Sequence, residues 1–346
     1  MKILVTGGAG FIGSHIAEYY SKRGEEVIVY DNLSRAEILG KEMKNITYIW
    51  DYLREKYLDI TLLKYDIRDI ERLRETVEGV DVIFHTAAQT AVTTSVIDPQ
   101  IDFSVNVGGT FNVLQVARES KKKPAIIFCS TNKVYGDNVN SIRVIEEEKH
   151  YRFEDKYDKG VLENFPIDLC EHTPYGCSKL TGDIYTQDYG HLYGLKIGVF
   201  RMSCIYGERQ FGVEDQGWVA HFVISTLLGR PITIYGDGKQ VRDVLYVTDL
   251  IEAYDRFLTS DLKLCVFNIG GGHKNKISLL ELLDIIAEST GERSEIKFAD
   301  WRPSDQKVYI SNLSRIKQLL GWEPKTDIKL GIKNLIDWVV KNKEIF

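Results

Sequence analysis

Residues 2–13 read KILVTGGAGFIG, and this stretch decides the fold. Residues 2–6 form a short apolar run typical of a strand, and Gly7, Gly10 and Gly13 follow it with G-x-x-G-x-x-G spacing. Such glycines let the backbone turn tightly, approach a pyrophosphate and pack the next helix close to the sheet, while the helix N-terminus favours negative charge. Taken alone, the stretch leaves open a tight strand-to-helix turn that binds no ligand.

Short apolar runs alternate with helical patterns through the first half of the chain. Strands that alternate with helices pair in parallel through right-handed crossovers, which predicts a doubly wound parallel α/β sheet of the Rossmann type. The predicted strands are residues 2–6, 27–30, 60–65, 80–85, 125–130 and 196–200.

The alternation breaks in two places, and these breaks predict the domain organisation. Charged residues replace the periodic pattern between 137 and 172, which predicts an excursion beside the active site. After residue 206, glycine-rich turns at 236–238 and 270–272 are followed by helical patterns at 279–289 and 328–341. We predict a dinucleotide-binding domain over residues 1–203 and a smaller α/β substrate-binding domain over residues 204–346, with residues 243–260 packing back on the first.

Composition excludes several classes of protein. The chain has 346 residues, 44% of them hydrophobic, and a net charge of -6, which argues against a general nucleic-acid binder. No export signal or long apolar stretch is recognisable, so no membrane association is expected. Five cysteines without paired spacing or accompanying histidines predict neither disulfides nor a metal site, and a reducing cytoplasm is the simplest compartment.

Two carboxylates follow predicted strands. Asp31 lies just past the second strand, where an acid can bind the ribose hydroxyls of an adenosine and repel a 2′-phosphate. NAD is therefore favoured over NADP, although the nearby Arg35 keeps that question open. Asp66, after the third strand, is expected either near the adenine or as a helix N-cap or turn residue.

Tyr175 and Lys179 are one helical turn apart, so on a helix they share a face. Thr173 and Pro174 read as an N-cap and a first helical residue. The Lys179 ammonium and a positive nicotinamide are expected to lower the pKa of Tyr175, making it a base near neutral pH. Thr131, at the end of the fifth strand, can donate to the same substrate oxygen. Although a Tyr-x-x-x-Lys pair often marks only a solvated helix face, here it comes in the order that hydride transfer requires.

These residues resemble a known family. Thr131, Tyr175 and Lys179 behind the glycine loop resemble the extended short-chain dehydrogenases that act on nucleotide sugars, across essentially the whole chain. Further matching strings are NVGGT at 106–110, VYG at 134–136, residues 201–207 and GDGKQVRD at 236–243. The resemblance implies an enzyme with tightly held NAD, and a homo-oligomer, dimer or tetramer, formed through helices around 99–120 and 175–192. It also implies that Asn106 supports the active site; an amide bonded to backbone is the other interpretation.

Thr131, Tyr175 and Lys179 are thus the predicted catalytic residues. The predicted cofactor-binding residues come from the glycine loop, the ends of the second, third and fourth strands, the helix around 99–120 and the catalytic helix: Gly7, Gly10, Phe11, Ile12, Gly13, Asp31, Asn32, Ser34, Arg35, Asp66, Ile67, Ala87, Ala88, Gln89, Asn106, Tyr175 and Lys179.

The pair Asn132 and Lys133 limits which reactions of the family this chain can catalyse. The family's 4,6-dehydratases typically carry Asp-Glu here to eliminate water, and neither residue of this pair can replace those carboxyl groups. STNKVYGD at 130–137, PYGCSK at 174–179, RQF at 209–211 and DQGWV at 215–219 resemble the CDP-paratose 2-epimerases, also called CDP-tyvelose 2-epimerases. That resemblance implies inversion at carbon 2 of a CDP-hexose, CDP-paratose to CDP-tyvelose or CDP-glucose to CDP-mannose, through a 2-keto sugar. A nucleotide-sugar 4-epimerase and a non-catalytic NAD-binding sensor are the alternatives.

Three arginines are candidates for the substrate's phosphates. Arg242 and Arg302 match the family's positions for pyrophosphate contacts, and Arg209 is a further candidate. The alternative for each is an ion pair with a carboxylate such as Asp243 or Asp305. The predicted substrate-binding residues are Gln89, Thr131, Asn132, Lys133, Arg209, Gln216, Arg242 and Arg302.

Overall fold

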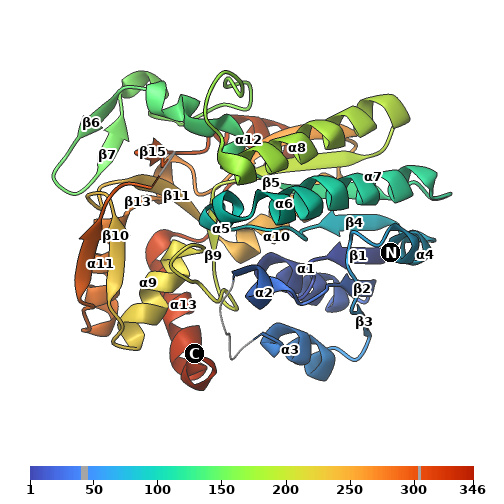
Figure 1. The fold of residues 1–346 in the computed structure, drawn as a ribbon, viewed down its shortest axis with the longest axis horizontal. Helices are drawn as coiled ribbons and strands as arrows, with labels where there is room; N and C mark the ends of the chain where they lie inside the picture. The colour runs from blue at the N-terminus through green and yellow to red at the C-terminus, as the bar shows by residue number, and fades with distance from the viewer. Residues whose placement is uncertain (40–45, 303–304) are drawn as a thin grey trace. The chain divides into compact units, whose positions relative to one another are not determined.

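A computed structural model describes residues 1–39, 46–302 and 305–346 (Figure 1). The chain divides into two compact units, each discontinuous in sequence. Unit 1 comprises Met1–Val134, Thr173–Arg201 and Ile251–Phe267, and unit 2 comprises Tyr135–His172, Met202–Leu250 and Asn268–Phe346.

This division differs from the sequence-based one in the placement of residues 135–172. We expected this segment within the first domain, but it groups with unit 2. Its hydrogen bonds explain the difference: Val161 forms a parallel bridge with Ser311, and the Tyr151 amide donates to the carbonyl of Lys239 at 2.9 Å. Such pairing between segments distant in sequence leaves no local sequence signal. The functional names given to the two domains remain predictions.

Unit 1 is built on a seven-stranded parallel sheet in the order β12-β8-β5-β4-β1-β2-β3 (Figure 1). The strands are β1 (Lys2–Thr6), β2 (Glu26–Tyr30), β3 (Ile60–Leu63), β4 (Val82–His85), β5 (Ala125–Thr131), β8 (Ile197–Met202) and β12 (Leu264–Ile269). The strand order reverses between β1 and β4, and ligands of such sheets bind outside the carboxyl ends of the strands at this point. The predicted doubly wound α/β fold is confirmed; β12 is the strand of this sheet that we did not predict.

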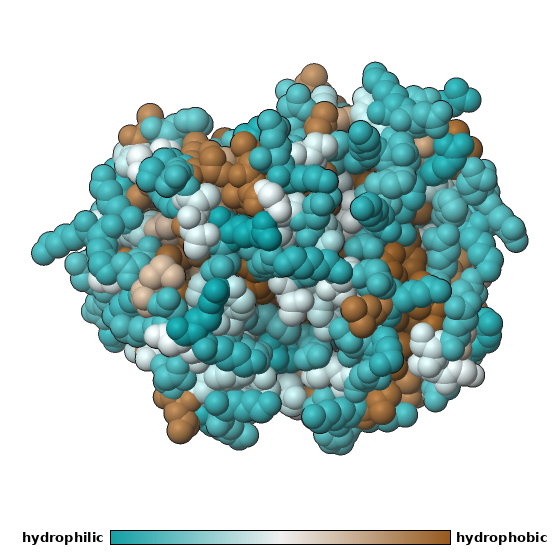
Figure 2. Space-filling model, turned by 180° about the vertical axis from the view of Figure 1, so that it is seen from behind, coloured by the Kyte–Doolittle hydropathy of each residue, from teal (hydrophilic) through white to brown (hydrophobic). Residues whose placement is uncertain are grey.

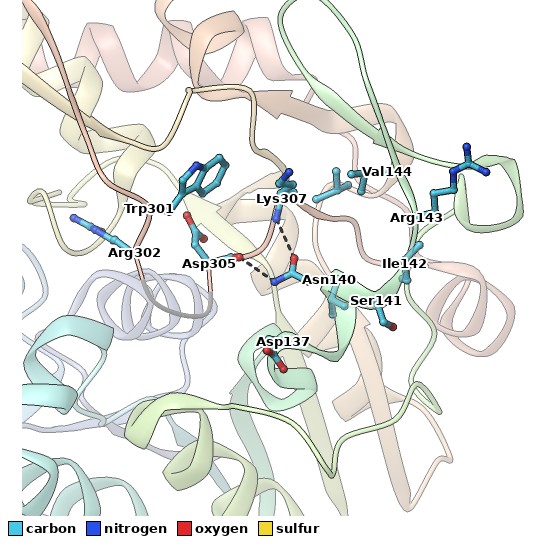
Figure 3. Close-up of a pocket in the computed structure, with 12 residues that line it drawn as sticks. Asp137, Asn140, Ser141, Ile142, Arg143, Val144, Trp301, Arg302, Asp305 and Lys307 are labelled. Atoms are coloured by element: carbon cyan, nitrogen blue, oxygen red, sulfur yellow. Dashed lines mark hydrogen bonds between the residues drawn. The ribbon is translucent and has the colours of Figure 1, made fainter.

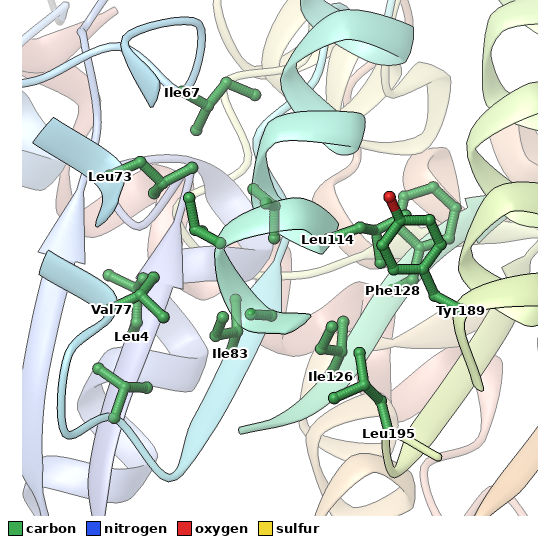
Figure 4. Packing of buried hydrophobic residues seen from close by; sticks show 14 of the residues in the cluster. Leu4, Ile67, Leu73, Val77, Ile83, Leu114, Ile126, Phe128, Tyr189 and Leu195 are labelled. Carbon is green, nitrogen blue, oxygen red and sulfur yellow. The ribbon is translucent and has the colours of Figure 1, made fainter. Parts of the chain in front are cut away.

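Helices cover the sheet and enclose its core. They are α1 (Phe11–Ser21), α2 (Arg35–Leu39), α3 (Tyr48–Lys56), α4 (Ile70–Val77), α5 (Val92–Ile97), α6 (Pro99–Phe103), the π-helix η1 (Ser104–Gly109), α7 (Thr110–Glu119), α8 (Thr173–Tyr193) and α10 (Val247–Thr259). Figure 4 shows Val77 of α4 beside Leu4 of β1, and Leu114 of α7 beside the rings of Phe128 and Tyr189, all in one buried cluster with Leu73, Ile83 and Ile126. These buried apolar residues hold a helical layer against the sheet.

Unit 2 contains smaller sheets around a separate apolar core. Its strands are β6 (Val144–Glu146), β7 (Tyr151–Phe153), β9 (Cys204–Tyr206), β10 (Ile232–Tyr235), β11 (Val241–Tyr246), β13 (Lys276–Ser278), β14 (Ile296–Ala299) and β15 (Val308–Tyr309). β11 pairs with β13, β15 and β9, β10 pairs with β14, and β6 and β7 form an antiparallel hairpin. The helices are η2 (Asn132–Ser141), η3 (Asp155–Tyr157), α9 (Trp218–Leu227), η4 (His273–Asn275), α11 (Leu279–Thr290), α12 (Ser314–Leu320), α13 (Ile328–Lys341) and η5 (Lys343–Ile345).

Local capping signals explain where two of these helices begin. Ser278 and Glu281 form a reciprocal capping box at the start of α11, and the Asp327 side chain accepts from the Leu330 amide at the start of α13. α13 spans the same residues as the predicted helix, and α11 extends one residue beyond it.

Hydrophilic residues predominate on the face of the molecule in Figure 2, where hydrophobic residues form separate patches. Across the described ranges, none of the helices combines the length and hydropathy that a membrane-spanning helix needs.

Candidate active site

The glycine loop between β1 and α1 needs residues without side chains. Gly7 has a φ of +69°, and a Cβ there would lie 2.6 Å from the Ala87 amide nitrogen. A Cβ at Gly13 would overlap the carbonyl oxygen of Gly7. The glycines therefore allow β1, α1 and the segment after β4 to approach one another closely.

The N-terminus of α1 is open to an anion. Its N-cap is Gly10, no side chain caps it, and its first turn contains no acidic residue. The backbone N–H groups of a first turn have no partner within the helix, and the helix dipole favours negative charge there. Phe11, Ile12 and Gly13, which we predicted to bind the cofactor, form this turn.

Asp31 joins the end of β2 to the glycine loop. Its carboxylate accepts from the Ala9 amide at 3.0 Å and from the Leu33 amide at 2.8 Å. Burial raises the pKa of Asp31, and these two hydrogen bonds lower it. A carboxylate has about four acceptor positions, so two remain for ribose hydroxyls.

The residues after β2 and β3 form one polar cluster. Asn32 donates to Asp66 at 2.8 Å and accepts from the Ser34 hydroxyl at 2.7 Å. Asp66 accepts from the Arg68 amide at 2.8 Å and from its guanidinium, which is the geometry of a turn residue; Asp69 caps α4. Burial raises the pKa of Asp66, but its hydrogen bonds outweigh burial and the net pKa is lowered.

The other predicted cofactor residues of this region are placed as follows. Arg35 begins α2, and burial lowers its pKa to about 10. Ile67 is buried and lies against Gly109, where a Cβ would overlap its side chain. Ala87 and Ala88 lie after β4, beside Gly7.

Gln89 offers a hydrogen-bond acceptor. The side chain is buried; its amide nitrogen donates to the Ala91 carbonyl at 2.7 Å, and the backbone N–H donates to Asn106 Oδ1 at 2.9 Å. The Oε1 atom is buried with no hydrogen-bond partner among the described residues. Buried polar atoms are usually paired, so this oxygen is suited to a ligand N–H or O–H donor.

Asn106 links the Gln89 segment to the catalytic helix. Its side chain donates to the Gln89 carbonyl and contacts the Ser178 hydroxyl, both at 3.0 Å. It lies in η1, and π-helical turns are frequent at functional sites. Asn106 therefore bonds a backbone group, as one prediction had it, and also connects that backbone to α8, which is compatible with the other prediction, support of the active site.

The beginning of α8 is fixed by side chains. Thr173 has a φ of +62°, an unfavourable conformation for a β-branched residue, and its hydroxyl accepts from the Gly176 amide at 3.5 Å. This contact fits the predicted N-cap, with Pro174 as the first residue after it. The Tyr175 amide donates to the Ser95 hydroxyl at 3.1 Å, so α5 anchors the residue that carries the phenol.

Thr131 and Lys179 are buried and Tyr175 is partly buried; they lie in unit 1, on β5 and α8. Burial raises the pKa of Tyr175 to about 12, and its hydrogen bond with Thr131 lowers it. Burial lowers the pKa of Lys179 to about 8, and its Nζ lies 4.5 Å from the centre of the Phe128 ring. Our expectation that the Tyr175 pKa falls is wrong for the protein groups alone, because burial of the phenolate outweighs its hydrogen bond.

Four polar residues that the sequence did not reveal support this site. His85 lies between the hydroxyls of Thr6 and Thr110, at 2.8 and 2.9 Å, and burial together with Lys179 lowers its pKa to about 3. The others are Ser95, Ser178 and Asp183. The Asp183 carboxylate accepts from the Ser130 hydroxyl at 2.6 Å and pairs with Arg201 at 2.9 Å. Adjacency to Thr131 or Lys179 could have suggested Ser130 and Ser178; no sequence signal marks Ser95.

Asn132 and Lys133 directly follow Thr131. The Thr131 hydroxyl donates to Asn132 Oδ1 at 3.3 Å, and the Lys133 amide donates to the Thr131 hydroxyl at 3.3 Å. Asn132 is buried and Lys133 partly buried. These positions thus place the Asn132 side-chain amide and the Lys133 backbone N–H beside Thr131.

In unit 2, two predicted phosphate-binding arginines are paired with carboxylates. Arg242 donates to Asp305 at 2.6 Å. Arg302 donates to Asp215 at 3.2 Å and lies 4.0 Å from the ring centre of Tyr235. The ion-pair alternative is therefore present for both arginines; Asp305 is one of the carboxylates that we named, and Asp215 is not.

A pocket of about 530 Å³ in unit 2 includes Arg302 and Asp305. Figure 3 shows Trp301 and Arg302 on one side and Asn140, which bonds the backbone of Asp305 and Lys307, in the centre. Arg209 and Gln216 do not line this pocket. Arg209 is buried with a φ of +61°, and the Gln216 backbone pairs with Val213.

These features fit a dinucleotide in unit 1. The uncapped first turn of α1 suits the pyrophosphate, Asp31 suits a ribose diol, and the Gln89 oxygen suits an amide donor. No cluster of His, Cys, Asp or Glu in the described part of the chain could hold a metal ion.

Comparison with known proteins agrees with this geometry. The model of the family described as "NAD dependent epimerase/dehydratase family" matches residues 3–270. The CDP-paratose 2-epimerase of Salmonella typhi is 38% identical over 350 residues, covering 98% of this chain and 99% of that protein.

Two solved structures share the fold. The UDP-glucose 4-epimerase of Thermotoga maritima, solved with UDP-glucose, matches with a TM-score of 0.81 and 30% identity over 99% of this chain and 100% of that one. The UDP-glucuronic acid 4-epimerase of Bacillus cereus, solved with UDP-glucuronic acid and NAD, has a TM-score of 0.81 and 26% identity over 99% and 100%. The chain therefore belongs to the NAD dependent epimerase/dehydratase family and is an NAD-dependent enzyme.

Proposed function

We propose that this enzyme inverts carbon 2 of a CDP-hexose, with CDP-paratose and CDP-tyvelose as the first candidates. The observation that carries the proposal is 38% identity to the Salmonella typhi CDP-paratose 2-epimerase along 98% of the chain. Asn132 and Lys133 support it, because neither can supply the carboxyl groups with which the family's dehydratases eliminate water.

In this proposal the protein moves a proton while the cofactor carries the hydride. When bound, NAD would supply the redox chemistry, which is uptake of a hydride from carbon 2 and its return to the opposite face of the sugar. The Tyr175 phenolate takes the proton of the carbon 2 hydroxyl and gives it back after the hydride returns. Thr131 donates to the same oxygen, and the Lys179 ammonium stabilises the phenolate. The cycle is redox neutral, and the 2-keto sugar has to rotate between the two transfers.

We propose that the remaining site residues bind the cofactor and the substrate. The first turn of α1 holds the cofactor pyrophosphate, Asp31 holds the adenosine ribose, and Gln89 Oε1 accepts from the nicotinamide amide or a sugar hydroxyl. Arg242 and Arg302 exchange their carboxylate partners for the diphosphate of the substrate, which a guanidinium can bind through two parallel hydrogen bonds. Arg209 and Gln216 are proposed to complete that site.

The direct test is incubation of the purified protein with CDP-paratose, CDP-tyvelose or CDP-glucose, with the configuration at carbon 2 followed by NMR. We expect interconversion of at least one pair. In heavy water little deuterium should appear at carbon 2, because the returning hydride comes from the cofactor and not from solvent. Absence of interconversion for all three substrates, with NAD present, would refute the proposal.

A nucleotide-sugar 4-epimerase is the second candidate. It is supported by the 30% identity and TM-score of 0.81 to the Thermotoga maritima UDP-glucose 4-epimerase. The catalytic residues are compatible with either carbon, since the orientation of the sugar decides which one faces the cofactor. Conversion of UDP-glucose to UDP-galactose, with no change at carbon 2 of CDP-sugars, would favour this candidate.

We also propose that the enzyme forms a homodimer through α6, α7 and α8. Large apolar side chains are exposed on these helices: Phe103, Phe111, Ile184, Tyr185 and Leu192. A small pocket between α7 and α8, lined by Phe111, Thr181 and Tyr185 among others, adds concave apolar surface. Contiguous exposed apolar surface of this kind commonly marks a protein–protein contact.

A further inference from the structure

Asp102 is a buried carboxyl group to which the proposed mechanism gives no role. It lies on α6, one helical turn before Asn106, and is 1% exposed. Asn106 Nδ2 donates to Asp102 Oδ1 at 3.0 Å, and Ser178 also forms a side-chain hydrogen bond with it. The structure gives it no arginine or lysine partner within ion-pair distance among the described residues. Burying a carboxyl group without a countercharge is costly, so its presence calls for a reason.

The neighbours of Asp102 connect it to the catalytic helix. Asn106 also contacts the Ser178 hydroxyl at 3.0 Å, and Ser178 can donate to the Tyr175 carbonyl at 3.1 Å. Ser178 immediately precedes Lys179 in the chain. The carboxyl group of Asp102 therefore holds two side chains that contact the turn of α8 on which Tyr175 and Lys179 lie.

Asp102 is one of the ionisable groups that influence the pKa of Lys179. The ionisable groups that influence Lys179 or are influenced by it come from α6, α8, β5 and β4: Asp102, Asp183, Cys129 and His85. Of these, Asp183 is already paired with Arg201 through two contacts at 2.9 and 3.0 Å. Burial raises the pKa of the Cys129 thiol to about 11, and burial keeps His85 neutral. Asp102 is thus the carboxyl group near Lys179 that has no guanidinium of its own.

We propose that Asp102 is a positioning residue for the Tyr175–Lys179 pair, whose carboxylate fixes Asn106 and Ser178 and supplies the buried negative charge that keeps Lys179 protonated. This inference rests on the proposed catalytic roles of Tyr175 and Lys179. In this inference the protonation of Lys179 depends on Asp102, a residue that is not proposed to contact the sugar or the cofactor.

The sign of the effect follows from electrostatics. A negative charge favours the ammonium form of Lys179 and disfavours the phenolate form of Tyr175, so Asp102 raises the pKa of both groups. Removing the charge must lower both. Two charges that lie beyond ion-pair distance in a protein interior can still interact strongly enough to shift each midpoint by roughly 0.5–1 pH unit.

Asp102→Asn removes the charge with little change in shape. The new amide oxygen can still accept from Asn106, and the new NH₂ group can donate to the Ser178 hydroxyl, which then donates to the Tyr175 carbonyl. Asp98→Asn is the matched control, because Asp98 is an exposed acid that caps the same helix and asparagine also caps well.

The first measurement uses the protein without substrate. Lysine labelled with ¹³C at Cε is titrated by NMR, with the Lys179 signal identified by its loss in Lys179→Arg. We expect a midpoint near pH 8 in the parent protein and in Asp98→Asn, and a midpoint about 0.5–1 pH unit lower in Asp102→Asn. An unchanged midpoint in Asp102→Asn would overturn the inference.

The second measurement is the pH profile of kcat. Both limbs of the profile should move to lower pH in Asp102→Asn, whereas a purely structural role would lower kcat without moving them. Ser178→Ala removes the hydrogen-bonded link but keeps the charge, so kcat should fall about tenfold with the limbs in place. An unchanged kcat in Ser178→Ala contradicts the positioning role, even if Asp102→Asn does not fold. An inactive parent enzyme would refute the proposed function, while the NMR titration would still test Asp102.

Discussion

Tyr175 is held in place by two contacts of different kinds. Its backbone amide donates to Ser95, and its phenol bonds to Thr131. With a pKa of about 12 the phenol is protonated at neutral pH, so a positive charge is required before it can act as a base. In the proposed mechanism the Lys179 ammonium would supply this charge, and the oxidised nicotinamide would supply a second one when NAD is bound.

Tyr175→Phe should abolish epimerisation while the fold persists. Loss of a general base typically costs about 10²–10⁴-fold in rate, so kcat should fall by at least about 10²-fold. NAD content, measured after denaturing the protein, should stay within twofold of the parent. Tyr185→Phe is the matched control on the same helix, because its hydroxyl is on an exposed residue. Substantial epimerase activity in Tyr175→Phe would remove this residue from the proposed mechanism.

Lys179 should make stability depend on pH in a defined window. Its pKa is about 8 in the folded protein and 10.5 ordinarily, so between these values the unfolded chain binds a proton that the folded one lacks. The free energy of unfolding contributed by this group therefore rises with pH from about 8 to about 10.5 and is at its lowest below pH 8.

Lys179→Met should lack this dependence. At pH 7 it should be more stable than the parent by roughly 1–3 kcal/mol, because a buried charge has been removed, and it should be inactive. Urea unfolding at pH 7, 8, 9 and 10 measures the difference between the two proteins, which should shrink as pH rises. A constant difference across this range would mean that Lys179 is not the titrating group.

The glycine loop shows how one element sets both packing and binding. A methyl group at Gly13 would overlap the Gly7 carbonyl, whereas one at Gly108 would meet no atom within 4 Å. Gly13→Ala should therefore lower the free energy of unfolding by roughly 1–3 kcal/mol and reduce NAD content. Gly108→Ala should leave stability unchanged or raise it by up to about 1 kcal/mol, since alanine favours helix. Denaturant unfolding compares the two; equal effects would contradict the close approach at Gly13.

Elements with a local signal could be predicted from the sequence. β1 and α13 match their predicted bounds, because continuous apolar runs and helical periodicity need no distant partner to be recognised. Gly7 directly follows β1, Gly13 lies in the first turn of α1 and Asp31 directly follows β2, as their spacing indicates, and their role in binding the cofactor stays a prediction. β12 was missed, and so was the π-helix η1, which interrupts an otherwise ordinary helical pattern.

Contacts between distant segments explain what could not be predicted. Ser95 meets Tyr175 across 80 residues of sequence, and Asp183 meets Ser130 across 53. The segment 135–172 was assigned to the wrong side of the domain division for the same reason. For the protein groups alone the pKa of Tyr175 is raised and not lowered, because sequence spacing reveals a neighbouring charge but not the degree of burial; the effect of the nicotinamide stays a prediction.

At the scale of the whole molecule, the proposed homodimer can be tested by introducing a charged residue into its interface. Ile184 on α8 is 48% exposed, and an aspartate there would place an unpaired charge in the proposed interface. Ile184→Asp should be a monomer in light scattering at concentrations where the parent is a dimer. Leu58→Asp is the control, because Leu58 is 90% exposed and lies outside α6, α7 and α8. A parent protein that is itself monomeric would refute the dimer.

The uncapped first turn of α1 has a consequence for the life of the protein in the cell. Gly10 provides no side chain to its amides, and glycine in place of a capping side chain costs about a few tenths of a kcal/mol, a deficit that a bound pyrophosphate removes. A newly made chain that has not yet acquired its dinucleotide is therefore the less stable form and opens more often. Cellular proteases degrade opened chains, so the supply of dinucleotide during synthesis should set how much of this protein accumulates.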